Sequence, residues 1–147
     1  MNKKLIIKRR TDFESSELEI IWLEVFPFKS KRSLLMSGIY RPPSYLKAGD
    51  IAIEANLEQA YFLNKEIILL GDFNINFHDS KNYNKHRLGK GLKNMNHKQL
   101  VKETTRPISG RNIIDHILSN QPQRIKNGCR NILVVSRLII YTFVFRT

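Results

Sequence analysis

The chain of 147 residues contains a single cysteine, Cys129, so no disulfide can form within it. Acidic residues are also scarce, because 13 Asp and Glu stand against 25 Lys and Arg, and the formal net charge is +12. One cysteine gives no sign of an oxidising compartment. The excess of cations favours polyanionic partners, nucleic acid first and anionic membrane second, although basic charge can also serve solubility alone.

The sequence has little that resembles a secretory signal or a membrane span. The N-terminal apolar run is only Leu5-Ile6-Ile7, which is too short for the core of a signal peptide. A more apolar stretch at 132–145 is interrupted by Arg137 and fits two buried strands better than a membrane span. We therefore expect an intracellular protein, nuclear or cytoplasmic, that is not secreted and does not bind membrane.

Length and composition fit one domain covering 1–147, with enough apolar residues for a core. Alternating apolar and polar residues predict a strand over 16–28, and a second, more buried strand follows at 33–40, so the pair forms a hairpin. A helical period predicts a helix over 49–64 with Asp50 as its N-cap. The helix's apolar side would consist of Ile51, Ala55, Leu57, Ala60, Tyr61 and Phe62.

The second half of the chain shows weaker periodicity. An apolar run at 66–70 predicts a strand covered on both faces, and a polar segment from 74 to about 95 has no clear period. We expect a short helix at 97–103 and strands at 112–119, 131–136 and 138–145. This succession predicts a mixed, layered α/β fold.

The strand at 66–70 runs into Gly71-Asp72-Phe73-Asn74. In extended backbone Asp72 and Asn74 would point the same way, beyond the carboxyl end of a strand, where ligands of α/β sheets collect. A carboxylate there can bind Mg²⁺ or Mn²⁺ or hold a nucleophilic water, and a carboxamide can contact a phosphate oxygen without repelling it. The pattern suits phosphodiester hydrolysis, although the same residue types also form ordinary turns.

Asp115 is a charged residue inside the apolar strand pattern of 112–119. A carboxylate in such a place costs free energy unless it has a partner. It is either part of a site or a structural carboxylate that accepts backbone N–H bonds.

Three motifs in this order, IYRPPS at 39–44, ILLGDFNIN at 68–76 and TTRPISGRNIIDHILS at 104–119, resemble the endonuclease/exonuclease/phosphatase superfamily. More narrowly, they resemble the endonuclease domains beside the reverse transcriptases of non-long-terminal-repeat retrotransposons. The resemblance covers about residues 15–145. It implies a four-layer α/β sandwich of two packed sheets, and divalent-metal-dependent cleavage of a DNA phosphodiester by an activated water.

The matched motifs imply a role for each of four residues. Tyr40 would hydrogen-bond the scissile phosphate, Asp72 would position or activate the water, and Asn74 would hold the phosphate and a metal-bound water. Asp115 would orient the family's general-base histidine. Asp72 and Asn74 would be the contacts of a weakly bound Mg²⁺ or Mn²⁺. For Tyr40 the alternative is a core tyrosine at a strand end.

A basic segment from Ser80 to Lys102 contains no acidic residue. Lys and Arg at this spacing bind phosphates without sequence preference, although a solvated loop has the same composition. Arg41 is expected at the mouth of the cleft, where it could meet a DNA phosphate. The predicted nucleic-acid contacts are Arg41, Lys81, Lys85, Arg87, Lys90, Lys93, Arg106 and Arg111.

The sequence departs from the family in two places. The family has Ser-Asp-His before its last strand, where this chain reads Val135-Ser136-Arg137-Leu138. The family's first-strand Asn and its metal-binding Glu would precede the matched region, so we expect a fold that is incomplete at its N-terminal side. His116 should face away from Asp115, because neighbours on a strand alternate, and His78, His86 and His97 lie in the polar region.

These departures leave two hypotheses. The first is a phosphodiester hydrolase of the retroelement endonuclease type, acting on the phosphate backbone of DNA, that is impaired in this chain. The second is a decayed, non-catalytic fragment that binds nucleic acid through its basic surface.

Overall fold

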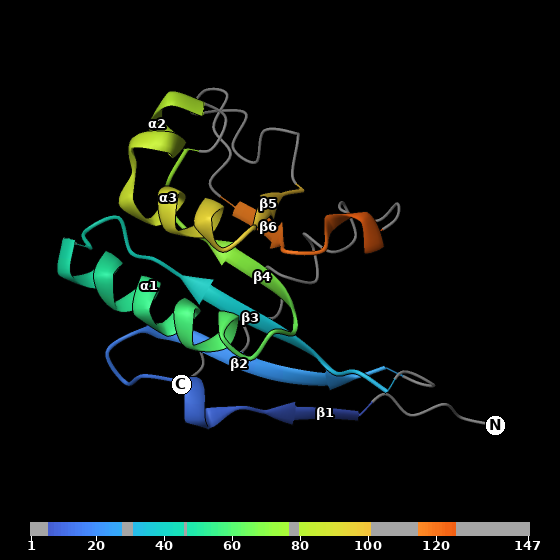
Figure 1. Ribbon diagram of the computed structural model, residues 1–147. Helices are drawn as coiled ribbons and strands as arrows, with labels where there is room; N and C mark the ends of the chain where they lie inside the picture. The colour runs from blue at the N-terminus through green and yellow to red at the C-terminus, as the bar shows by residue number, and fades with distance from the viewer. Residues whose placement is uncertain (1–5, 28–30, 46, 77–79, 101–114, 126–147) are drawn as a thin grey trace.

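The computed structural model describes residues 6–27, 31–45, 47–76, 80–100 and 115–125 (Figure 1). One sheet contains six strands in the order β1-β2-β3-β4-β6-β5. The strands are β1 Ile6–Arg9, β2 Glu19–Phe26, β3 Leu34–Tyr40, β4 Glu66–Asp72, β5 Lys98–Gln99 and β6 Asp115–Ser119. The helices are α1 Lys47–Tyr61, α2 Ser80–Lys85 and α3 Arg87–Asn94, with short 3-10 turns η1 Thr11–Phe13 and η2 Pro122–Arg124.

The sheet is mixed, as predicted. β2 and β3 form the expected antiparallel hairpin, whereas β3 and β4 are parallel and are joined through α1. β6 then pairs with β4 in the antiparallel sense. Among the described residues this sheet and the helices on one of its faces make up two of the four layers expected. The strands predicted at 131–145 lie outside the described residues.

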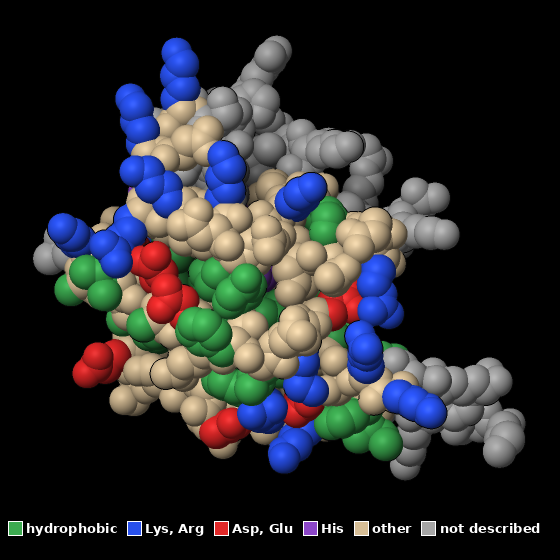
Figure 2. Space-filling model, in the orientation of Figure 1, with side chains coloured by type: hydrophobic (Ala, Val, Ile, Leu, Met, Phe, Trp, Pro, Cys, Tyr) green, Lys and Arg blue, Asp and Glu red, His purple; other side chains and the backbone are tan. Residues whose placement is uncertain are grey.

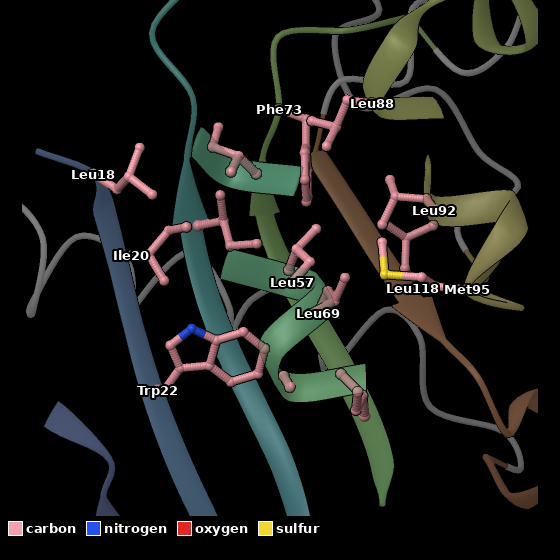
Figure 3. Packing of buried hydrophobic residues seen from close by; sticks show 14 of the residues in the cluster. Leu18, Ile20, Trp22, Leu57, Leu69, Phe73, Leu88, Leu92, Met95 and Leu118 are labelled. Atoms are coloured by element: carbon pink, nitrogen blue, oxygen red, sulfur yellow. The ribbon is translucent and has the colours of Figure 1, made fainter. Parts of the chain in front are cut away.

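The core lies between the sheet and the helices α1 and α3 (Figures 1 and 3). Trp22, Leu69 and Leu118 from three different strands are buried there against Leu57 of α1 and Leu92 of α3. Burying each of these side chains stabilises the fold by roughly 1.5–3 kcal/mol before chain entropy is counted. The apolar face of the sheet therefore holds both helices in place.

The opposite face of the sheet is apolar as well. Leu70 and Ile117 are buried there, with Met36 and Ile68 packed against them. Because Leu69 faces the helices and Leu70 faces the other way, β4 is buried on both faces, as its continuous apolar run predicts.

Helix α1 begins at a different residue from the predicted helix, and a different side of it is buried. It begins at Lys47, so Asp50 is not the N-cap but a buried residue in the first turn. Ile51 and Phe62, predicted on the buried side, are 41% and 80% exposed. A buried bond from Trp22 Nε1 to Asn56 Oδ1, 2.8 Å long, helps to fix which side of the helix faces the sheet.

The polar segment after residue 74 contains two helices, α2 and α3, that its composition did not predict. The side chain of His86 caps the N-terminus of α3. Ser, Thr, Asp and Asn are the usual N-cap residues, so a histidine at this position did not indicate a helix start in the sequence. The helix expected at 97–103 is wrong over the described part, because Lys98–Gln99 form β5 against β6. No helix in the described ranges is both long enough and apolar enough to cross a membrane.

Gly71 gives the first testable prediction. A Cβ at this position would lie 1.9 Å from the backbone oxygen of Ile39 on the neighbouring strand, and backbone cannot move aside cheaply. We expect Gly71→Ala to lower the free energy of unfolding by about 2 kcal/mol or more, measured by urea denaturation.

Gly91→Ala is the matched control for this prediction. Its Cβ would meet only the side-chain end of Glu54, at 2.9 Å, and alanine favours a helix by up to about 1 kcal/mol over glycine. The Gly91→Ala variant should be as stable as the wild type or more so. Equal losses in both variants would contradict the steric explanation.

Candidate active site at the ends of β3, β4 and β6

The sheet aligns three of the four family-matched residues in one row. Tyr40 at the end of β3 pairs with Asp72 at the end of β4, and Asp72 pairs with Asp115 at the start of β6. Neighbouring strands lie about 4.7–4.9 Å apart, so the three backbones are adjacent. Residues that the sequence separates widely are therefore gathered at one end of the sheet.

Asn74 joins this row through a turn. β4 ends at Asp72, whose Oδ1 accepts a bond from the backbone N–H of Asn74 at 2.9 Å. Asn74 has a φ of 48°, in the left-handed region that Asn tolerates better than most residues. The extended geometry expected between Asp72 and Asn74 is thus wrong, because the chain turns there, but the two residues remain in direct contact.

Arg41 connects the ends of β3 and β4. Its backbone N–H donates to the carbonyl oxygen of Asp72 at 2.8 Å. Its own carbonyl oxygen accepts a bond of 2.8 Å from Nδ2 of Asn74. These bonds hold the amide of Asn74 beside the last residues of both strands.

The guanidinium of Arg41 is buried and forms an ion pair with Asp50 of α1. Nε lies 2.6 Å from Oδ1 and one terminal nitrogen lies 3.1 Å from Oδ2, so the pair is bidentate. The other terminal nitrogen donates to the Phe73 carbonyl at 3.4 Å. The prediction that the Arg41 guanidinium contacts DNA at the mouth of a cleft is therefore corrected. Its N–H donors are bonded to Asp50 and to the Phe73 carbonyl oxygen.

An open hollow of about 500 Å³ lies beside this network, and its lining residues are Arg41, Asn74, Ile75, Asn76, Lys85 and His86. Of the predicted cationic contacts, Lys85 and Arg41 reach this hollow. Lys81, Lys90 and Lys93 are exposed on α2 and α3, where Lys and Arg side chains gather at the upper left of Figure 2. Arg87 is paired with Glu54 at 2.7 Å, and Arg106 and Arg111 lie outside the described residues.

His86 lines the hollow but is held by α1 and α3. Its Nδ1 accepts a bond from the backbone N–H of Leu88 at 3.2 Å, and Nε2 lies 3.6 Å from Oδ2 of Asp50. Burial lowers the pKa of His86, and Asp50 opposes that effect. When Nδ1 accepts the capping bond, the proton of the neutral ring sits on Nε2, so neither nitrogen is a base toward the hollow.

His116 points into the helix-covered face of the sheet, as strand alternation predicts. Its ring is fully buried against Phe73, with centroids 5.4 Å apart. Nε2 lies 3.0 Å from the carbonyl oxygen of Ile75, and the other nitrogen contacts the side-chain amide of Gln99. Burial lowers the pKa of His116 to about 3, so this ring stays neutral and structural.

The described part of the chain contains no group of three His, Cys, Asp or Glu side chains that could hold a metal ion. Asp72 supplies hard carboxylate oxygens, the ligand type that Mg²⁺ prefers. One of those oxygens already accepts the Asn74 N–H. The donor set therefore fits a divalent ion only as a site in which water supplies most of the ligands.

Sequence reasoning missed Asp50 and His86 as neighbours of the site. Asp50 looked like a helix cap because it stands near the start of a helical pattern, and His86 stands in a segment without a period. No spacing rule pairs Arg41 with Asp50 across the turn that contains Pro42 and Pro43. Their association becomes visible only when α1 is packed on the sheet.

Comparison with profiles of known protein families gives no match, and comparison with curated protein sequences gives none either. Solved structures do match. The chain is similar to the endonuclease domain of TRAS1, a telomere-specific non-LTR retrotransposon, with 12% identity and a TM-score of 0.60 over 78% of this chain and 53% of that one. An endonuclease/exonuclease/phosphatase family protein from Bacteroides thetaiotaomicron is similar with 17% identity and a TM-score of 0.50, over 68% of this chain and 40% of that one.

These similarities show the fold. The described sheet and helices have the endonuclease/exonuclease/phosphatase architecture, which confirms the fold that the three motifs predict. The chain spans about half the length of the TRAS1 domain and less of the bacterial protein.

The buried ion pair between Asp50 and Arg41 gives a prediction about stability. Removing one partner of a buried ion pair leaves the other charge uncompensated, which typically costs about 3–5 kcal/mol. We expect Asp50→Asn to lower the free energy of unfolding by about 3 kcal/mol in urea denaturation. Glu54→Gln, which breaks the more exposed Arg87–Glu54 pair, should cost about 1 kcal/mol or less. Similar losses in the two variants would contradict a special role for Asp50.

His97 gives a prediction about pH. The ring of His97 is buried, and neither of its nitrogens has a hydrogen-bond partner within the described ranges. Burial lowers its pKa from 6.5 to about 4. Between these pH values the unfolded chain binds a proton that the folded chain does not, so acidification from pH 6.5 to 4 should destabilise the fold.

Titration of His97 and His116 should each steepen this pH dependence by up to about 1.4 kcal/mol per pH unit. We expect His97→Leu to flatten the slope of unfolding free energy between pH 6.5 and 5, measured by urea denaturation at several pH values. Glu24, whose pKa is lowered to about 2 by Ser33, Lys65 and Arg10, acts below this window. An unchanged slope in His97→Leu would rule out the assignment.

Proposed function

We propose that this chain is a divalent-metal-dependent phosphodiester hydrolase of the retroelement endonuclease type that acts on DNA with reduced activity. The observation that carries the proposal is the row formed by Tyr40, Asp72 and Asp115, with Asn74 tied to its edge. This row lies at the carboxyl ends of the parallel strands β3 and β4, where α/β folds bind their ligands.

Asp72, Tyr40 and Asn74 each have a chemical task in this proposal. The carboxylate of Asp72 orients the attacking water and contributes to binding Mg²⁺ or Mn²⁺. The Tyr40 hydroxyl donates a hydrogen bond to a non-bridging phosphate oxygen, and the Asn74 amide supplies a neutral contact to the same phosphate. A divalent ion, when bound, would neutralise charge that develops on the phosphate during hydrolysis.

The reduced activity is expected because no histidine among the described residues is placed as a general base, and His78 lies outside the described residues. The family's Ser-Asp-His is missing from the sequence, and the side chains of His86 and His116 serve the fold. His97 lies beyond α3 beside β5, which pairs with the far end of β6. Loss of a general base typically slows a reaction by about 10²- to 10⁴-fold.

DNA is the proposed substrate because α2 and α3 carry exposed lysines, and Lys85 among them lines the hollow beside Arg41 and Asn74. Lys81, Lys85, Lys90 and Lys93 project from α2 and α3, and phosphate contacts of this type bind DNA without reading its sequence. The proposal keeps an intracellular location, nuclear or cytoplasmic, where DNA is accessible.

A second candidate is a non-catalytic protein that binds nucleic acid through its basic surface. The bond from the Asn74 N–H to the Asp72 carboxylate favours it, because this bond gives Asp72 a structural role that needs no chemistry. Among the described residues, Asp72 has no second acidic, histidine or cysteine side chain grouped with a third to hold a metal ion. This arrangement also suits binding without hydrolysis.

Plasmid nicking separates the two candidates. We expect the wild-type chain to nick supercoiled DNA slowly with Mg²⁺ or Mn²⁺ and not after chelation. Asp72→Asn is the informative variant, because an amide oxygen can still accept the Asn74 N–H while the negative charge is lost. This variant should nick at least about 100-fold more slowly, measured by gel conversion of supercoiled to open-circular plasmid.

Asp12→Asn is the matched control, since Asp12 is an exposed aspartate on η1 whose partner is Arg10. Its nicking rate should equal that of the wild type. DNA binding without metal-dependent nicking in the wild type would establish the second candidate instead. Nicking that survives in Asp72→Asn would show that another site, or a contaminant, is responsible.

A further inference from the structure

The end of the sheet opposite to the candidate active site carries a larger cavity, of about 690 Å³. It is bounded by the end of β2, the start of β3 and the start of β4, and by residues that follow β6. The distance from Leu34 to Tyr40 along β3 is about 20 Å at the usual rise per residue. This cavity is therefore separate from the row of Tyr40, Asp72 and Asp115.

Cations dominate the lining of this cavity, which contains Lys31, Arg32, Lys65 and Arg124. Lys31 and Arg32 are exposed, and Arg124 keeps 61% of its side chain accessible while it pairs with Glu66 at 2.9 Å. At the right of Figure 2, Lys and Arg side chains gather on this end of the molecule. The cavity thus presents several positive groups to solvent at once.

The carboxylate of Glu24 in the lining is neutralised by its own partners. Arg10 lies 2.8 Å from one of its oxygens, and Lys65 lies 3.1 Å from the other, which also accepts a bond from Ser33. These contacts lower the pKa of Glu24 to about 2, so the carboxylate is ionised at neutral pH beside the positive charges of Arg10 and Lys65. Lys65 and Arg124 offset the lining carboxylates Glu24 and Glu66, so the positive excess of the cavity is carried by Lys31 and Arg32.

Aromatic side chains stand at the side of the same surface. A second hollow of about 330 Å³ shares Asn64, Lys65, Asn120 and Gln121 with the first, so the two are adjacent. Tyr61 and Phe62 line this second hollow, 36% and 80% exposed, with their rings 5.9 Å apart. Within the described part of the chain, Phe62 is therefore largely open to solvent apart from its contact with Tyr61.

The floor of this surface is rigidly built. Asn120 accepts a bond from the backbone N–H of Ile67 at 2.8 Å and donates to the carbonyl of Lys65 at 3.0 Å. Asn64 closes the preceding turn with a φ of 53°. These bonds tie Asn120, which follows β6, to the first residues of β4 in the lining that both hollows share.

We propose that this surface, the distal groove, binds single-stranded nucleic acid. Cationic side chains along a groove can follow the phosphates, and exposed aromatic rings offer faces on which unpaired bases stack. A duplex keeps its bases paired and cannot use the rings. An acidic protein segment could use the cations but has no bases to stack on Phe62. The proposal does not depend on hydrolysis at Asp72.

Fluorescence anisotropy with a labelled oligothymidylate of about 15 nucleotides tests the proposal, with chelator present so that no metal-dependent cleavage occurs. The groove variant carries Lys31→Gln, Arg32→Gln and Phe62→Ala, three substitutions of exposed residues. We expect it to bind the oligonucleotide about 10-fold or more weakly than the wild type, while a blunt duplex of equal length loses less.

Two control variants test whether weaker binding reflects loss of a specific site, or only loss of net positive charge or of an exposed apolar side chain. Lys8→Gln with Lys47→Gln removes two exposed cations, one from β1 and one from α1, that belong to neither the groove nor the proposed DNA-binding surface of α2 and α3. Ile51→Ala removes an exposed apolar side chain of α1 that does not line the groove either. Both controls should bind the oligothymidylate within about three-fold of the wild type at 0.15 M salt, where distant charges are screened.

The outcomes divide clearly. A loss confined to the groove variant, with its urea midpoint unchanged, supports the distal groove. An equal loss in the Lys8→Gln, Lys47→Gln control or an equal loss for the duplex would overturn it. Polyglutamate binding that is as tight as oligothymidylate binding and as sensitive to Phe62→Ala would overturn it as well. Plasmid nicking by the same groove variant tests the hydrolase separately, because Asp72 is untouched.

Discussion

The buried ion pair between Arg41 and Asp50 organises the candidate active site. Asp50 belongs to α1 and Arg41 follows β3 directly, so the pair fixes the helix against the end of the sheet. The backbone of Arg41 then binds Asp72 on one side and the amide of Asn74 on the other. The position of the carboxamide relative to the row of strand ends thus depends on a charge pair that touches no substrate.

A pair of this kind is retained for geometry more than for stability. Two buried charges repay their desolvation only when the contacts are well formed, and an apolar replacement is often as stable. Here the bidentate contact and the hydrogen bond from the guanidinium to the Phe73 carbonyl fix the segments that follow β3 and β4 in one arrangement. His86 extends the same network to α3 through Asp50.

A second buried carboxylate, Glu24, has the same function at the other end of the sheet. It gathers Arg10, Ser33 and Lys65 from three separate segments, and these contacts lower its pKa to about 2. Each end of the sheet therefore has an anionic centre that orients cations and loops. The two ends differ in what they leave at the surface: a carboxylate beside a tyrosine at one end, and lysine, arginine and aromatic rings at the other.

Sequence reasoning succeeded where structure depends on neighbours in the chain. The β2–β3 hairpin and the strand β4 follow from alternation and from an unbroken apolar run. The adjacency of Tyr40, Asp72 and Asp115, which are far apart in sequence, was expected only from the resemblance of three motifs to one family. Sequence reasoning failed where distant contacts decide. β5 exists because the edge of β6 offers unpaired backbone groups to Lys98 and Gln99, which no local pattern reveals.

Helix α1 shows the same limit within one element. Its apolar residues are compatible with more than one buried side, because Ile51, Ile53, Leu57 and Phe62 are spread around the helix. The side that faces the sheet is chosen by partners far away in sequence, Trp22 bonding to Asn56 and Arg41 bonding to Asp50. Asp50 was therefore assigned to a cap when its place is inside the core.

Asp72 is the residue at which architecture and chemistry overlap. Its Oδ1 accepts the Asn74 N–H, and that bond would shape the turn equally well in a chain that hydrolyses nothing. An amide oxygen can accept the same bond, so the turn requires an acceptor but not a negative charge. Catalysis by contrast requires the charge, because binding a divalent ion and orienting a water toward phosphate both depend on a carboxylate. The fold alone is therefore neutral between an enzyme and a binding protein, and the charge on one oxygen pair is the physical quantity that distinguishes them.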